Sequence, residues 1–99
     1  MAYRIEYSPA CLEHLRRLPA GEQAAVLDAI DRQLAHQPMV ETRNRKPMRP
    51  NPLAPWELRL GHPRVYYDVE ADSEQVVRVL AVGIKERERV RIGDKEMRL

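Results

Sequence analysis

The sequence is poor in the features that mark secreted and membrane-spanning proteins. It has a single cysteine, Cys11, which cannot form an intramolecular disulfide, and its first residues lack the basic-then-apolar pattern of a secretory signal. Its longest apolar stretch, residues 76–84, falls short of the roughly 20 residues that cross a bilayer. These absences predict a soluble cytoplasmic protein that does not associate with a membrane.

Other scarce residue types limit the interior and the chemistry of the protein. There is no phenylalanine, so we expect a thin, aliphatic core. The three histidines and the cysteine show no metal-ligand spacing, and the sequence predicts neither a metal site nor a cofactor. With 43% hydrophobic residues and no low-complexity run, the chain is predicted to form a single domain over residues 1–99.

Charge is low overall but unevenly distributed along the chain. The net charge is +2, and residues 1–40 and 68–99 each carry one more acid than base. Residues 41–67 contain six cations against two acids, a local balance of +4. A polyanion is the natural partner of such a segment.

The first third of the chain has the pattern of a strand followed by two helices. Residues 3–7 alternate between apolar and polar, as a half-buried strand does. Ser8 and Pro9 suit the N-cap and the first position of a helix, and a second helix is expected from residue 20 or 21 to about residue 36. The apolar stripes of the two helices are expected to be Cys11, Leu12, Leu15 and Leu18 in the first and Leu27, Ile30 and Leu34 in the second.

The remainder of the chain has the pattern of a long loop followed by three strands. Five prolines in residues 37–55 exclude a regular helix and deny a strand its hydrogen-bond donors. Alternation predicts a hairpin over residues 56–69, and the valine-rich residues 76–84 are typical of a central strand. No secondary structure is assigned to the charged tail after Gly83.

The order strand, helix, helix, strand, strand, strand predicts an α+β fold. We expect an antiparallel sheet of about four strands with the N-terminal helical hairpin packed on one face. The other face of the sheet is expected to be open. Alternation places Arg64 and Tyr66 on the same side of their strand, and Trp56, Tyr67, Tyr3 and Tyr7 are interpreted as packing residues.

Four short stretches, together with their order and spacing, are similar to those of a family of small bacterial toxins. They are Tyr-Arg-Ile-Glu-Tyr-Ser-Pro at residues 3–9, Trp-Glu-Leu-Arg-Leu-Gly at 56–61, Arg-Val-Tyr-Tyr-Asp-Val at 64–69 and Val-Leu-Ala-Val-Gly at 79–83. This pattern covers nearly the whole chain and resembles the RelE/ParE superfamily, and residues 41–47 look like its RelE-like branch. The resemblance implies the toxin of a type II toxin–antitoxin system. Its partners would be a cognate antitoxin and, through the antitoxin, operator DNA.

The superfamily includes two activities, and the resemblance leaves the choice between them open. RelE members cleave messenger RNA in the ribosomal decoding site, which implies a metal-independent endoribonuclease with the ribosome and mRNA as partners. ParE members inhibit DNA gyrase and have no catalytic activity. A third alternative is an inactive remnant that retains only antitoxin binding.

The resemblance also implies which residues carry out the cleavage. Arg64 and Arg59 match the family's phosphate-binding positions, and Lys85 matches the cation that follows the last core strand. Glu57 is a candidate to accept the hydroxyl proton if it faces the open side of the sheet. RNA contacts are predicted for Arg43, Arg45, Lys46, Arg49, Tyr66 and Arg91, with Tyr66 stacking on a base.

Each of these residues also has a simpler interpretation. The cations of residues 43–49 could form a solvated loop or bind an acidic antitoxin segment. Arg59 and Arg64 could form cross-strand ion pairs with Glu57 or Asp68. The region that matches the C-terminal His or Tyr of many active members, residues 85–91, contains neither, so no proton donor is assigned. His14 and His36 are expected to be exposed.

Overall fold

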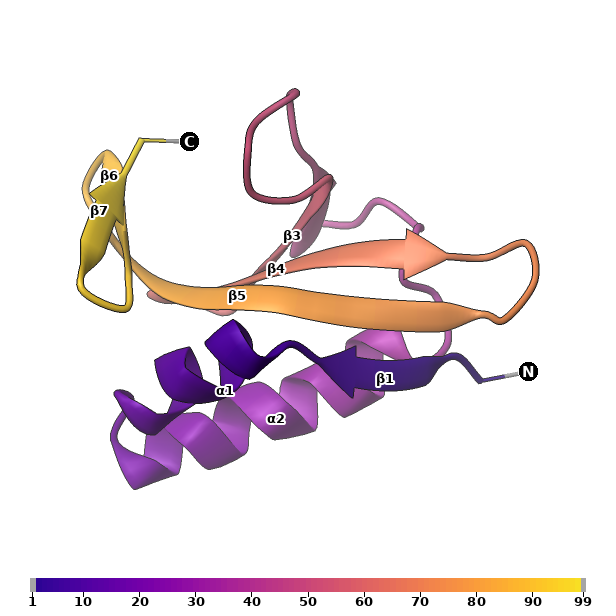
Figure 1. Ribbon diagram of the computed structural model, residues 1–99, viewed down its shortest axis with the longest axis horizontal. Coiled ribbons are helices and arrows are strands. Elements are labelled where there is room, and N and C mark those ends of the chain that lie inside the picture. The colour runs from indigo at the N-terminus through magenta and orange to yellow at the C-terminus, as the bar shows by residue number, and fades with distance from the viewer. Residues whose placement is uncertain (1, 99) are drawn as a thin grey trace.

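The protein folds into a sheet covered on one face by two helices, and the computed structural model describes residues 2–98 (Figure 1). The helices α1 and α2 lie side by side under the sheet. The connection between β2 and β3 and the hairpin of β6 and β7 rise on the other side. The elements are β1 (Arg4–Tyr7), α1 (Pro9–Arg16), α2 (Ala20–Leu34), β2 (Arg45–Pro47), β3 (Trp56–Arg59), β4 (Pro63–Glu70), β5 (Val76–Glu86), β6 (Arg89–Ile92) and β7 (Lys95–Met97).

The helices begin where the sequence predicted. Ser8 is the N-cap of α1, and its hydroxyl accepts a hydrogen bond from the backbone N–H of Cys11 at 3.0 Å. In α2 the buried residues are Val26, Ala29, Ile30 and Leu34. The stripe predicted for α2 was wrong at Leu27, which is exposed. Leu34, Ile30 and Val26 are four residues apart and lie on one face of the helix, which is buried. Leu27 lies next to this face and is exposed.

The sheet is larger than predicted, and it is mixed. Within residues 2–98 the sheet has seven strands: six follow the order β2-β3-β4-β5-β6-β7, and β1 pairs with β5 in parallel. The sequence predicted about four strands and only antiparallel pairing. The tail after Gly83, which had no assignment, forms the end of β5 and the β6–β7 hairpin. The proline-rich segment was wrongly denied a strand, because β2 is at the sheet edge, where Pro47 is tolerated.

The main core lies between the helices and the sheet, as predicted. It contains buried residues of both helices, among them Cys11, together with Leu58, Tyr67 and Val79 from the sheet. Burial raises the pKa of the Cys11 thiol to about 11, which makes it unreactive. The Tyr67 ring stacks on Trp56, with ring centroids 6.1 Å apart, and its hydroxyl donates to the Pro38 carbonyl at 2.7 Å.

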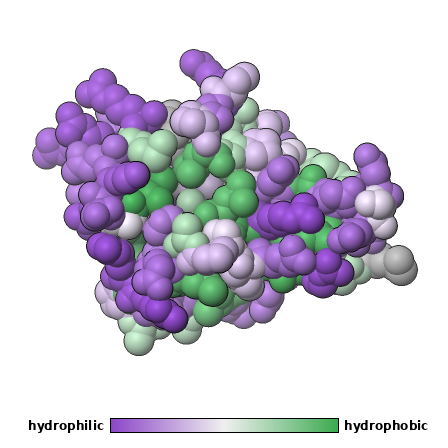
Figure 2. Space-filling view, in the orientation of Figure 1, coloured by the Kyte–Doolittle hydropathy of each residue, from purple (hydrophilic) through white to green (hydrophobic). Residues whose placement is uncertain are grey.

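A second apolar cluster lies on the sheet face that was expected to be open. Its buried residues are Ala54, Tyr66, Ala81, Val90 and Ile92. The loop between β2 and β3 and the β6–β7 hairpin supply the residues that cover Tyr66 and Ala81. Figure 2 shows hydrophilic residues at both ends of one side of the molecule and hydrophobic residues gathered between them.

Candidate active site

A hollow of about 530 Å³ lies among the proline-rich loop, β3, the end of β5 and the C-terminal segment. It is on the sheet side away from the helices, where the loop and the β6–β7 hairpin rise (Figure 1). Its polar lining consists of five cations, one carboxylate and one amide. These are Lys46, Arg49, Arg59, Lys85, Arg98, Glu57 and Asn51.

The cations of the hollow differ in how they are neutralised. Lys46 Nζ lies 3.4 Å from a Glu41 carboxylate oxygen, and Arg59 pairs with Glu57. Arg49, Lys85 and Arg98 form no ion pair with any of residues 2–98. The hollow therefore presents an excess of positive charge, and it suits a phosphate-bearing ligand.

Glu57 is the central carboxylate of the site, and only 6% of the residue is exposed. Its Oε1 lies 2.7 Å from Arg59 Nε and 3.7 Å from Arg64 Nη1. Strand geometry explains the cluster: Glu57 and Arg59 are two residues apart on β3, and Arg59 is directly opposite Arg64 in the β3–β4 register. A carboxylate and two guanidinium groups are thus held together on one face of the sheet.

Arg64 does not line the hollow and reaches the site through Glu57. Its side chain is 17% exposed, and its Nε donates to the Gly61 carbonyl at 3.1 Å. This bond orients the guanidinium, so that Nη1 faces the Glu57 carboxylate.

Tyr66 lies on the predicted face but cannot stack on a base, because its side chain is fully buried. Among residues 2–98 its hydroxyl has no partner that meets hydrogen-bond geometry, although the Glu57 carboxylate is near enough to influence it. Burial and the negative charge of Glu57 raise the pKa of Tyr66 above its ordinary value. The structure therefore does not bring Tyr66 to the surface of the hollow, because the loop and the hairpin cover it, and strand alternation cannot anticipate that cover.

Three predicted RNA-binding cations lie outside the hollow. Arg45 is only 8% exposed, and its Nη1 donates to the Gln33 carbonyl of α2 at 2.6 Å, so the structure does not bring it to the hollow. Arg43 is exposed but does not line the hollow. Arg91 pairs with Glu86 at 3.2 Å and lines a different hollow beside α1.

Sequence reasoning missed two polar residues of the hollow, Asn51 and Arg98. Asn51 stands between Pro50 and Pro52, and an Asn among prolines is a turn signal that could have pointed to it. Arg98 follows β7, a strand whose mixed charges show no sustained period. No signal in the sequence indicated that this end of the chain returns to β3.

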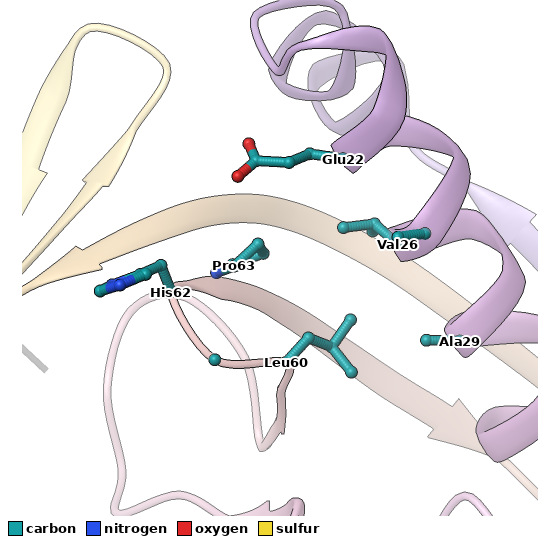
Figure 3. Close-up of a pocket in the computed structure, with 8 residues that line it drawn as sticks. Glu22, Val26, Ala29, Leu60, His62 and Pro63 are labelled. Atoms are coloured by element: carbon teal, nitrogen blue, oxygen red, sulfur yellow. The ribbon is translucent and has the colours of Figure 1, made fainter.

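A second hollow of about 530 Å³ lies between α2 and the turn that joins β3 to β4. Figure 3 shows Val26 and Ala29 of α2 on one side and Leu60 and Pro63 on the other, with Glu22 and His62 near one end. Its walls are mainly apolar. It lacks the combination of a buried carboxylate and paired cations found around Glu57, so we place the candidate active site in the cationic hollow.

No model of a protein family matches the chain, and no curated protein matches it. Among solved structures, a chain in the crystal structure of the toxin–antitoxin complex RelBE2 from Mycobacterium tuberculosis is similar, with a TM-score of 0.71 and 24% sequence identity. The match covers 86% of this chain and 100% of that chain. The two proteins share a fold, and the predicted α+β architecture, with two helices on one face of a sheet, is confirmed.

Within residues 2–98, no helix is both long and apolar enough to span a membrane. Nor does the range contain a group of three or more His, Cys, Asp or Glu side chains placed to hold a metal ion.

Proposed function

We propose that this chain is the toxin of a type II toxin–antitoxin pair and that it cleaves messenger RNA without a metal ion. The observation that carries the proposal is the buried Glu57 carboxylate held between Arg59 and Arg64, at a hollow with three cations that form no ion pair with residues 2–98. The fold shared with a chain of a toxin–antitoxin complex supports it.

The chemistry requires a base, stabilisation of negative charge and a proton donor. The RNA 2'-hydroxyl attacks the adjacent phosphorus, the new O2'–P bond forms and the P–O5' bond breaks, which leaves a 2',3'-cyclic phosphate and a 5'-hydroxyl. Glu57 accepts the proton of the 2'-hydroxyl. Arg59 and Arg64 remain charged throughout and stabilise the extra negative charge on the phosphate oxygens.

The entering phosphate also prepares the base. In the free protein both guanidinium groups face Glu57. A phosphate that binds these groups displaces the carboxylate and frees its oxygens to accept a proton. Lys85 is the candidate to protonate the departing O5', because it lines the hollow and forms no ion pair with any of residues 2–98. Lys46 and Arg49 would bind neighbouring phosphates.

The partners follow from this activity. The ribosome would present single-stranded mRNA to the hollow, and a cognate antitoxin would inhibit the toxin and link it to operator DNA. Such a system operates in the cytoplasm.

An assay with translating ribosomes tests the proposal. Purified protein is added to ribosomes that translate a defined message, and primer extension locates new 5' ends. We expect new ends with the wild type and about 10²- to 10⁴-fold slower formation of these ends with Glu57→Gln. If the wild type produces no new ends, the endonuclease assignment is wrong.

One observation favours a second function, a ParE-like inhibitor of DNA gyrase. Within residues 2–98, no His or Tyr side chain lines the cationic hollow, although His and Tyr are common proton donors. A supercoiling assay with purified gyrase separates the two functions, because only a gyrase inhibitor blocks supercoiling. An inactive remnant would produce no growth arrest when it is expressed without its antitoxin.

A further inference from the structure

The loop of residues 48–55 forms one wall of the cationic hollow, and it is closed at its base. The backbone N–H of Met48 donates to the Pro55 carbonyl at 2.8 Å. Between these ends, Pro50 and Pro52 have no N–H group. The loop therefore has few backbone donors of its own with which to hold its shape.

The side chain of Asn51 supplies the missing hydrogen bonds. Its Oδ1 accepts from the backbone N–H groups of Leu53 at 2.8 Å and Ala54 at 3.0 Å. Its Nδ2 donates to the carbonyls of Arg49 at 2.7 Å and Ala54 at 2.9 Å. A carboxamide has two donor hydrogens and two acceptor lone pairs, and here all four are used within the loop.

The far side of the loop is held by apolar packing. Ala54 is buried in the second apolar cluster with Tyr66, and Met48 and Leu53 pack against the same cluster. The loop is thus fixed to the sheet on one side and tied internally by Asn51. Arg49 lies between these two restraints, with its backbone carbonyl bound to Asn51 Nδ2 and its side chain exposed at the hollow.

We propose that Asn51 is a positioning residue that holds Arg49 at the hollow, where the guanidinium binds a phosphate of single-stranded RNA. The inference rests on the proposed RNA-cleaving function. A cation on an ordered loop loses less conformational freedom on binding than one on a mobile loop, so the bond to the Arg49 carbonyl raises RNA affinity without touching RNA.

The salt dependence of RNA binding tests this role. The affinity for a fluorescent single-stranded oligoribonucleotide is measured over a series of salt concentrations for Asn51→Ala, Arg49→Ala and the double variant. Each phosphate contact on a single strand contributes about 0.7 to the slope of log affinity against log salt. We expect Arg49→Ala to lose about 0.7 from this slope, Asn51→Ala to lose the same amount, and the double variant to lose no more than either.

Gln23→Ala is a matched control. The Gln23 side-chain amide also donates to a backbone carbonyl, that of Leu18 at 2.8 Å, but it does so between the two helices. Its loss is expected to leave the salt slope at the wild-type value. A change that appears in both amide variants indicates general loosening of the protein and overturns the inference.

Asn51→Ser protects the test against a variant that fails to fold. Serine keeps an oxygen that can accept from the Leu53 and Ala54 N–H groups, but its shorter side chain lacks the Nδ2 group that donates to the Arg49 and Ala54 carbonyls. Circular dichroism establishes that the variant is folded, and its salt slope is expected to fall like that of Arg49→Ala. A folded Asn51→Ser variant with the wild-type slope overturns the inference, as does an additive loss in the double variant. If the wild type itself binds RNA without salt dependence, the proposed function fails first.

Discussion

Oε1 of Glu57 lies 2.7 Å from Nε of Arg59, two residues further along the same strand. The carboxylate is almost fully buried, whereas about half of the arginine side chain is exposed. The buried group is therefore neutralised by a partner that solvent or a ligand can reach. This arrangement lets a phosphate exchange with the carboxylate at the guanidinium, and the first two predictions test it.

Replacement of Glu57 by glutamine should separate RNA cleavage from RNA binding. Gln keeps the shape of the side chain but cannot accept the hydroxyl proton, and a general base contributes about 10²- to 10⁴-fold to a rate. We expect single-turnover cleavage to fall by about that factor. RNA affinity should be equal to or above the wild-type value, because the phosphate no longer competes with a carboxylate. Glu41→Gln, which removes the partner of Lys46 outside the hollow, should cleave at the wild-type rate.

Replacement of Arg64 by alanine should abolish growth arrest at a small cost in stability. The variant loses the guanidinium that stabilises the transition state, but Glu57 keeps its closer partner Arg59. We expect the free energy of unfolding to fall by about 1 kcal/mol, measured by urea denaturation. Growth after induction reports toxicity. A folded Arg64→Ala variant that still arrests growth would show that Arg64 is not part of the site.

Strand alternation was sufficient to predict on which face of the sheet the key site residues lie. Glu57, Arg59, Arg64 and Tyr66 follow the period of two within paired strands, and the structure places all four on the side away from the helices. Their exposure was not predictable in the same way. Tyr66 is buried because segments distant in sequence pack over it, and local periodicity contains no information about such contacts.

The proline-rich segment shows a second limit of sequence reasoning. Its charge predicted a cationic loop, and Lys46 and Arg49 do line the hollow. Arg45 belongs to a short edge strand that no pattern indicated, and neighbouring residues of a strand point to opposite faces. Arg45 consequently lies against α2 while Lys46 faces the hollow.

The buried position of Arg45 leads to a prediction about stability. Its guanidinium donates to the Gln33 carbonyl in the last turn of α2, where a cation interacts favourably with the helix dipole. Arg45→Ala leaves that carbonyl without its donor and should lower the free energy of unfolding by about 2 kcal/mol in urea denaturation. Arg43→Ala, at an exposed position two residues earlier, should change it by less than about 0.5 kcal/mol. Equal stabilities of the two variants would contradict this role.

His14 should make stability depend on pH. It was expected to be exposed, but its Nδ1 accepts the backbone N–H of Val82 at 3.2 Å. Burial, and then the charge of Arg17, lower its pKa below the ordinary value of 6.5. The unfolded chain therefore binds the proton more readily than the folded one. The contribution of neutral His14 to the stability of the folded state is fully present above about pH 6.5. It is lost as the pH falls through 6.5 toward the lowered pKa of the folded state.

Thermal unfolding at pH 7.5 and pH 5.5 checks this expectation. Wild-type Tm should fall on acidification, and the fall should be smaller in His14→Gln, which has no proton to gain at this position. His36→Gln is the control, because His36 is exposed and should leave the difference in Tm unchanged. If acidification lowers the Tm of His14→Gln and of the wild type by the same amount, protonation of His14 does not cause the loss of stability at low pH.

Gly83 in β5 has no room for the methyl group of an alanine. A Cβ there would lie 2.7 Å from Val90 Cγ1 and 2.8 Å from Ile92 Cγ1 of β6, and 2.9 Å from the Arg91 carbonyl oxygen. The backbone oxygen cannot rotate away, so β6 must shift. We expect Gly83→Ala to lower the free energy of unfolding by about 1–3 kcal/mol.

Gly21 of α2 provides the opposite case, since a Cβ there has nothing within 4 Å. Gly21→Ala should raise the free energy of unfolding by about 0.5–1 kcal/mol, because alanine favours the helix.

Gly83→Ala and Gly21→Ala should also differ in their effect on the cationic hollow. A shift of β6 moves the hairpin that leads to Arg98, so Gly83→Ala should weaken RNA binding while Gly21→Ala should not. Unchanged RNA affinity in a folded Gly83→Ala variant would show that the position of the β6–β7 hairpin does not affect RNA binding.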